Sequence, residues 1–148
     1  MQRLYTLLLI FGLAVAGLQA QSVDIVGDWQ GVITQNDGGY RPQYTFEIAV
    51  RQDADGNLYG QTYVSFEEVT ATMSFTGEMI DDKTFSFQES EIVGATELDD
   101  MDWCIKSGKL NLMRQGRKWI LTGPWKGQSE FGACVPGFIV LKKKEPRA

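Results

Sequence analysis

Apolar and polar residues alternate with a period of two along most of the chain, and this pattern constrains the fold more than any other feature. Successive side chains of a β-strand point to opposite faces, so such alternation is typical of strands that bury one face. The alternating segments, together with less regular ones rich in β-forming residues, lie at 26–35, 44–51, 56–66, 69–76, 84–88, 109–113, 118–125 and 137–143. The sequence therefore predicts about eight strands.

Short turn sequences rich in Asp, Asn and Gly separate these segments. They lie at 36–39, 53–57, 67–68, 81–83 and 115–117. After residue 20 no long stripe of apolar residues has the helical period, and only the link at 92–102 has room for a short helical turn. Eight antiparallel strands can close on themselves and remove their exposed edges. We therefore predict an all-β fold, an eight-stranded antiparallel up-and-down barrel, with a two-sheet β-sandwich as the alternative.

The inward positions change from odd to even numbers between Trp103 and Leu112, which predicts a bulge or bend at Ser107-Gly108.

The first twenty residues read as a segment outside the fold. Arg3 is their only charge, and the uncharged run at 4–18 is shorter than the roughly 20 residues that a membrane-spanning helix needs. Ala20 ends an acceptable cleavage site. The pattern predicts a signal peptide at 1–20 and a single barrel domain at 21–148. We therefore expect the mature protein to be secreted or periplasmic, with no transmembrane segment.

The chain has two cysteines, Cys104 and Cys134. An exported protein meets an oxidising environment, which favours a disulfide between them. A reactive thiol pair is the weaker interpretation, because the C-x-x-C spacing and any neighbouring histidine are missing. Two free buried thiols are the remaining alternative.

The chain contains no histidine, which excludes Ser-His-Asp and Cys-His catalysis and His-ligated metal sites. With 14 Lys and Arg against 19 Asp and Glu, its net charge of -5 argues against nucleic acid as a partner. Most acids fall in turns or at outward positions. Glu78 and Glu89 are exceptions, and we expect both to be exposed. Taken together, the missing histidine and the outward placement of the acids favour a monomeric protein that binds rather than catalyses, without a cofactor or metal.

Aromatic side chains are the main candidates for a functional site. Those expected to face inward are Trp29, Tyr44, Phe46, Phe75, Phe85, Phe87, Trp119 and Trp125. They can line a pocket for a small apolar or aromatic ligand. Alternatively they fill the interior, because an eight-stranded barrel is only just wide enough for its own side chains. Tyr59 and Tyr63 have the opposite parity, so we expect them to face outward, where they could contact a protein or a glycan.

Acidic residues gather at 97–102, with Glu89 and Glu91 shortly before them. Carboxylate oxygens are ligands for calcium, but a solvated loop explains this stretch better. The segment at 53–57 resembles the start of a calcium loop, and a hairpin turn explains it better. No metal site is therefore predicted.

Gly27-Asp28-Trp29 opens the first strand and resembles the G-x-W signature of the lipocalin and avidin-like (calycin) barrels. In those families the tryptophan closes one end of an eight-stranded meander, and a small hydrophobic ligand enters at the other end. The segments at 56–60 and 75–78 are similar to strand patterns of the same class, and the portion from 103 to 137 resembles small secreted bacterial domains. The chain has no T-D-Y segment, and its late arginine, Arg147, lies in the tail. The resemblance thus implies the barrel, and not biotin, retinoid or haem binding.

Two functions are compatible with these features. The first is an exported, non-enzymatic binding protein that takes a small apolar or aromatic ligand into the barrel. The alternative is an interaction module with a packed interior, which contacts a protein or a glycan through its outer face or through the loops at 92–102 and 127–133.

Overall fold

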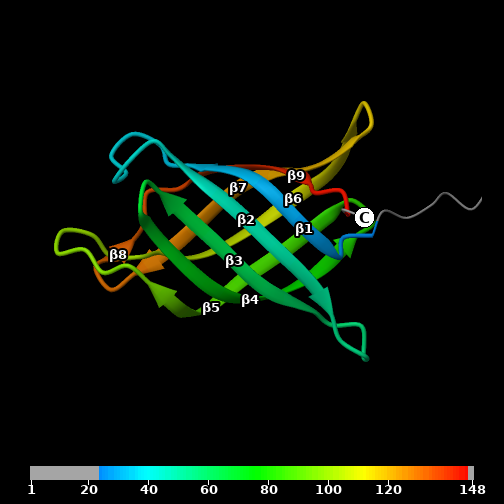
Figure 1. Ribbon diagram of the computed structural model, residues 1–148, viewed down its shortest axis with the longest axis horizontal. Helices are drawn as coiled ribbons and strands as arrows, with labels where there is room; N and C mark the ends of the chain where they lie inside the picture. The colour runs from blue at the N-terminus through cyan, green and yellow to red at the C-terminus, as the bar shows by residue number, and fades with distance from the viewer. Residues whose placement is uncertain (1–23, 147–148) are drawn as a thin grey trace, which may run out of the picture.

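The computed structural model describes residues 24–146, which form one closed β-barrel (Figure 1). Its strands are β1 (Gly27–Thr34), β2 (Gln43–Gln52), β3 (Leu58–Phe66), β4 (Val69–Asp81), β5 (Thr84–Ala95), β6 (Ile105–Gln115), β7 (Lys118–Ser129), β8 (Gly132–Ala133) and β9 (Gly137–Lys143). The described residues contain no helix, and so none that is long and apolar enough to cross a membrane. The signal peptide predicted at 1–20 lies outside the described residues.

The barrel is an antiparallel meander in which β1 to β7 pair in sequence order and β9 lies between β7 and β1. Pairing of β6 with β7 and of β9 with β1 leaves the main sheet without a free edge. The two-residue β8 only extends β7 in a small hairpin. The predicted all-β, eight-stranded up-and-down barrel is confirmed, and the closing pairs exclude the two-sheet sandwich.

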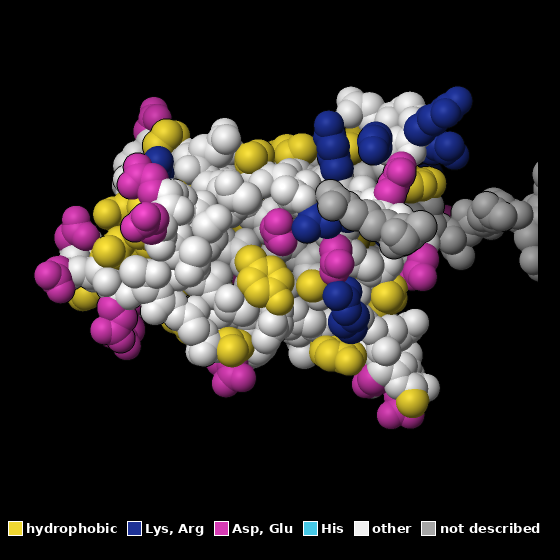
Figure 2. All heavy atoms as spheres, viewed as in Figure 1, with side chains coloured by type: hydrophobic (Ala, Val, Ile, Leu, Met, Phe, Trp, Pro, Cys, Tyr) yellow, Lys and Arg dark blue, Asp and Glu magenta, His cyan; other side chains and the backbone are white. Residues whose placement is uncertain are grey.

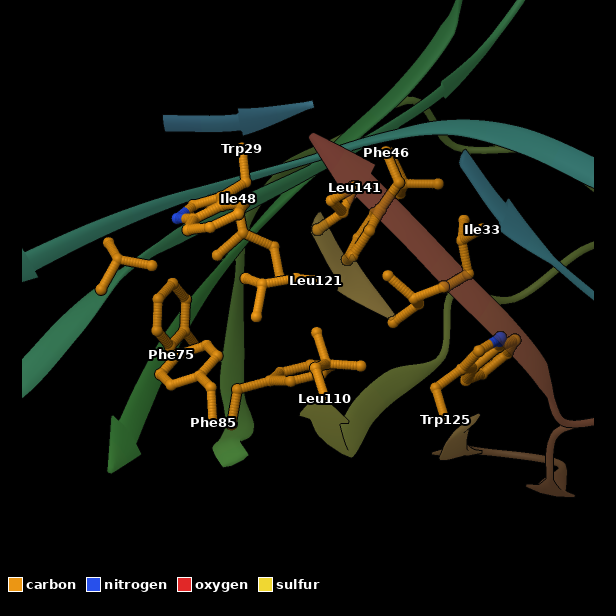
Figure 3. Packing of buried hydrophobic residues seen from close by; sticks show 14 of the residues in the cluster. Trp29, Ile33, Phe46, Ile48, Phe75, Phe85, Leu110, Leu121, Trp125 and Leu141 are labelled. Atoms are coloured by element: carbon orange, nitrogen blue, oxygen red, sulfur yellow. The ribbon is translucent and has the colours of Figure 1, made fainter. Parts of the chain in front are cut away.

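The alternation places one face of every long strand in a common interior (Figure 3). Trp29, Phe46 and Phe85 have no exposed surface. The ring of Phe75 packs edge-on against Phe85 and Phe87, with centroids 6.2 and 6.4 Å away. Burial of each such ring stabilises the fold by roughly 1.5–3 kcal/mol. The central layers of the barrel are therefore filled by its own side chains.

Trp29 closes one end of the barrel, the end from which both termini of the described chain leave (Figure 1). Its indole Nε1 donates a hydrogen bond to the carbonyl of Ile25 at 3.0 Å. The ammonium of Lys143 lies 5.7 Å from the centroid of the Trp29 ring and donates to the carbonyl of Asp24. A lysine of β9, rather than an arginine, thus lies over the first-strand tryptophan.

The bulge predicted at Ser107-Gly108 is wrong. Pairing of β6 with β5 and with β7 keeps one register through these residues, and the irregularities lie in the pairing of β4 with β5. Even-numbered positions of β6 face inward from Lys106 onward. The apparent change of parity arises because Trp103 belongs to a loop and because the first inward residue is charged.

The link at 92–102 forms no helical turn. Its first residues continue β5 to Ala95, and Leu98 and Met101 form an isolated β-bridge around a turn.

Candidate functional site

Four connections gather at the end of the barrel opposite Trp29, and we call them the mouth loops: 35–42, 67–68, 96–104 and 130–136 (Figure 1). A disulfide with an S–S distance of 2.04 Å joins Cys104, just before β6, to Cys134, between β8 and β9. This confirms the predicted disulfide. Cys104 and Cys134 each follow closely on a segment expected to meet a partner, 92–102 and 127–133.

Two of the hydrogen bonds that hold the 96–104 loop in place involve its side chains Trp103 and Asp102. The indole Nε1 of Trp103 donates to the carbonyl of Thr96 at 2.9 Å, which ties the two halves of the loop together. The amide of Glu130 donates to a carboxylate oxygen of Asp102 at 2.8 Å, which ties this loop to its neighbour. With the disulfide, these bonds keep the loop against the open end of the barrel.

A cavity of about 60 Å³, which we call the mouth pocket, lies between this loop and the barrel interior. It is lined by Ile33, Gln35, Tyr40, Tyr44, Val64, Met101, Asp102, Trp103, Cys104, Lys106 and Trp125. Most of this surface is apolar, and several of its polar groups are fixed by hydrogen bonds within the protein. Tyr44 donates its hydroxyl to Gln35 Oε1 at 2.8 Å, and Trp125 donates its Nε1 to the carbonyl of Thr34 at 2.8 Å.

Burial raises the pKa of the Tyr44 hydroxyl above its usual value of 10.0, and this outweighs a backbone hydrogen bond and the charge of Arg41, which lower it. The hydroxyl therefore stays protonated and keeps its role as donor to Gln35 at neutral pH.

Beneath the pocket lies an ion pair between Glu89 of β5 and Lys106 of β6. The Lys106 Nζ is 3.0 Å from Glu89 Oε2, and the two side chains are 5% and 0% exposed. The expected exposure of Glu89 is wrong, because this residue has the same parity as the buried Phe85 and Phe87. Glu78 is exposed, as predicted.

Each polar atom of this pair has a partner inside the protein. Glu89 accepts the Thr62 hydroxyl at 2.5 Å and the backbone N–H of Lys106 at 2.7 Å. The Lys106 ammonium also donates to the Cys104 carbonyl at 3.2 Å and lies 4.0 Å from the Met73 sulfur. Such full pairing offsets the cost of burying two charges.

The Glu89 carboxylate also replaces part of a strand pairing. The ladder between β5 and β6 ends at the pair Gln88 and Ser107, so the N–H of Lys106 has no strand partner on that side. Glu89 takes that N–H, and the two strands diverge beyond it toward the mouth. The 96–104 loop, rather than a continued ladder, occupies this end of the two strands, and its residues 101–104 line the mouth pocket.

The eight predicted rings separate into three groups. Trp29, Phe46, Phe75, Phe85 and Phe87 belong to the packed interior. Tyr44 and Trp125 line the mouth pocket. Trp119 is half-buried at the other end of β7, where the Arg114 guanidinium lies 5.7 Å from its ring centroid. Trp103 and Gln35 line the pocket and were missed, since one lies in a loop and the other just past the end of β1.

The outward-facing tyrosines are placed as predicted: Tyr59 is 47% exposed and Tyr63 is 37% exposed. On another part of the outer wall, a hollow of about 470 Å³ lies over β5, β6 and β7. It is open to solvent, and its lining combines polar side chains, among them Ser86, Lys109 and Lys126, with apolar surface that includes Pro124.

No group of three or more Asp, Glu or Cys residues in the range 24–146 is placed to hold a metal ion. The Asp53 carboxylate instead accepts the backbone N–H groups of Asp55 and Asn57, each at 2.9 Å, which makes the segment a hairpin turn. The hydrogen bond from the Asn57 backbone is the main reason why the pKa of Asp53 lies below its usual value.

The fold defines the class of this protein as a closed eight-stranded antiparallel barrel, the architecture that calycins share. Comparison with family models, with curated proteins and with solved structures finds no match for the chain. The residues of the mouth therefore carry the functional argument.

Proposed function

We propose that this protein is an exported, calycin-like binding protein without enzymatic activity, and that it binds its partner at the mouth of the barrel. The observation that carries the proposal is the mouth pocket, an apolar hollow with a few fixed polar groups, as is typical of binding sites. Trp103 and Trp125 supply two of its walls. Both are braced by hydrogen bonds, so the pocket is formed before a ligand arrives.

The size of the pocket limits what can enter. A cavity needs about 10–15 Å³ to hold one water molecule, so a cavity of about 60 Å³ has room for roughly four to six atoms of that size, about one side chain. The layers below are filled by Phe46 and its neighbours. This favours a ligand that anchors one small apolar group in the mouth and leaves its remainder among the mouth loops.

The state of the Glu89–Lys106 pair favours binding over catalysis. A reactive lysine or carboxylate needs a free position facing its substrate. Here the Lys106 ammonium is within reach of Glu89, Cys104 and Met73, and Glu89 is held by Thr62 and the Lys106 backbone. We assign the pair to the polar floor of the pocket.

The disulfide supports export, because such bonds persist in the periplasm and outside the cell. The proposal joins this observation to the signal-peptide pattern at 1–20.

Titration with p-cresol, a molecule the size of one aromatic side chain, tests the proposal. Amide and indole NMR shifts should move around Trp103, Trp125 and Gln35, with a dissociation constant on the order of 1 mM. Val64→Met places a longer side chain in the pocket and should abolish these shifts. Val140→Met, the same exchange at an exposed position of β9, should leave them unchanged.

A second variant changes the pocket in the opposite direction. Met101→Ala removes part of the covering loop, and p-cresol should then bind more tightly. The proposal would be overturned if neither Val64→Met nor Met101→Ala changed the affinity for p-cresol. It would also be overturned if the NMR shifts were confined to residues of the outer wall.

A further inference from the structure

The mouth loops are strongly acidic. They contain eight acids and a single base, Arg41; the acids are Asp37, Glu67, Glu68, Glu97, Asp99, Asp100, Asp102 and Glu130. This excess of seven negative charges exceeds the net charge of -5 of the whole chain. The mouth is thus the source of the negative charge of the protein. In Figure 2, acidic side chains lie at both ends of the visible face, whereas almost all basic ones lie toward the closed end, which leaves the mouth end mainly acidic.

The one base among these loops is already engaged. The Arg41 guanidinium lies 4.4 Å from the ring centroid of Phe66, and its nearest nitrogen is 3.8 Å from Glu67. Apart from Glu67, no acid of the mouth loops forms an ion pair within residues 24–146. Several carboxylates therefore surround the mouth pocket without a positive counterpart in the described part of the chain.

Apolar rings stand among these acids. Phe131, at the tip of the β7–β8 hairpin, is 89% exposed, and Tyr40, on the rim of the pocket, is 47% exposed. Exposed rings beside an apolar pocket are typical of surfaces that meet another protein. The mouth end thus combines a small anchor site, exposed rings and unbalanced negative charge.

We infer that the occupant of the mouth is a basic peptide segment of a partner protein, which inserts one apolar side chain into the mouth pocket and places lysines or arginines against the mouth loops. This inference rests on the proposed function and names the partner of the same site. Charge complementarity selects a basic partner, because binding relieves repulsion among the acids and the field draws positive ligands inward.

The dimensions favour a peptide over a small cationic molecule. The pocket accepts one side-chain-sized group, whereas the acids are spread over all four mouth loops. A small amine anchored in the pocket can reach few of them, but an extended chain carries several positive charges across the rim. Each exposed pair contributes little alone, so a peptide gains affinity by forming several at once.

Binding of a synthetic peptide with one phenylalanine between two pairs of lysines tests the inference, with Trp fluorescence and NMR shifts of Trp103 and Trp125 as readouts. This peptide should bind roughly tenfold more tightly than 2-phenylethylamine, which carries the same ring and one charge. Replacing its lysines by glutamates, or its phenylalanine by alanine, should abolish binding. Salt should weaken it between about 20 mM and about 300 mM.

Charge reversal on the protein supplies the matched control. Asp99→Lys with Asp100→Lys alters the 96–104 loop and should lower the affinity for the peptide at least severalfold, with no effect on p-cresol. Asp55→Lys with Asp82→Lys makes the same change of charge in turns at the closed end and should leave both affinities unchanged.

Three results would overturn the inference. The first is equal affinity for the lysine and the glutamate peptide. The second is an equal loss of peptide affinity in both double variants. The third is an affinity for 2-phenylethylamine equal to that for the peptide, which would identify a small amine as the occupant. In each of these cases p-cresol can still bind at the mouth, so the proposed function would survive. Failure of p-cresol itself is the result that would remove both.

Discussion

Glu89 and Lys106 form an ion pair across neighbouring strands inside the barrel, with 3.0 Å between the ammonium and the carboxylate. They are the charged side chains that the described part of the protein buries. Loss of one partner leaves the other charge without compensation, which costs about 3–5 kcal/mol. We therefore expect Glu89→Leu and Lys106→Met each to lower the free energy of unfolding by about this amount, as measured with guanidinium chloride.

The double variant Glu89→Leu with Lys106→Met should be less destabilised than the two single effects added together. It removes both charges, but the Lys106 N–H loses its carboxylate acceptor at a cost of about 1–3 kcal/mol. Simple additivity in this double-mutant cycle would contradict the role assigned to the pair.

The disulfide should stabilise the mouth more than the remainder of the barrel. It closes a loop with a sequence separation of 30 residues, which corresponds to about 3–4 kcal/mol in the chain-entropy model. We expect Cys104→Ser with Cys134→Ser to lose that stability. Hydrogen exchange should then accelerate in 96–104 and 130–136, with β2 to β4 still protected. Uniform acceleration over all strands would argue against a local role.

The two classes of predicted ring should respond differently to truncation. Phe85→Ala empties space inside the packed core and should cost about 3–5 kcal/mol of unfolding free energy. Trp119→Ala removes a half-buried ring at the closed end of the barrel and should lower the free energy of unfolding clearly less. If Phe85→Ala were tolerated, with a ligand taking the place of the ring, the interior would be a binding cavity after all.

Tyr44 should make stability fall with pH in the alkaline range. Burial raises its pKa above 10.0, so above that pH the unfolded chain loses this proton while the folded protein keeps it. Stability from this group is therefore complete below about pH 10 and declines as pH rises toward the higher folded pKa. Tyr44→Phe should remove that portion of the decline, together with the latest step of the tyrosinate absorbance at 295 nm. An unchanged titration would show that Tyr44 is not desolvated.

Strand alternation made the fold predictable, because each strand buries one face and the pattern reports that face directly. The segment around Phe46, the tyrosines facing outward and the disulfide all followed from residue type and spacing. The prediction failed at Glu89, because charged residues are normally assigned to the surface. The parity of Phe85 and Phe87 indicates that Glu89 faces inward, so at this position the place in the strand outweighs the residue type.

The mouth was predictable only in part. Tyr44 and Trp125 lie at the mouth ends of regular strands, so alternation identified them as inward-facing. Trp103 reaches the pocket through a loop whose path depends on the disulfide and on the Asp102–Glu130 hydrogen bond. Contacts of this kind join residues that are distant in the sequence, so no local sequence pattern predicts them.

The pairing of β1 with β9 brings the two ends of the described chain side by side, and the Lys144 N–H donates to the Asp28 carbonyl at 2.8 Å. A short linker could therefore connect the ends, and the chain could be reopened at the turn at 82–83 to give a circular permutant that begins with β5. In both arrangements every chain end lies opposite the mouth. Immobilisation or fusion through either terminus would leave the mouth facing outward, free to meet a partner.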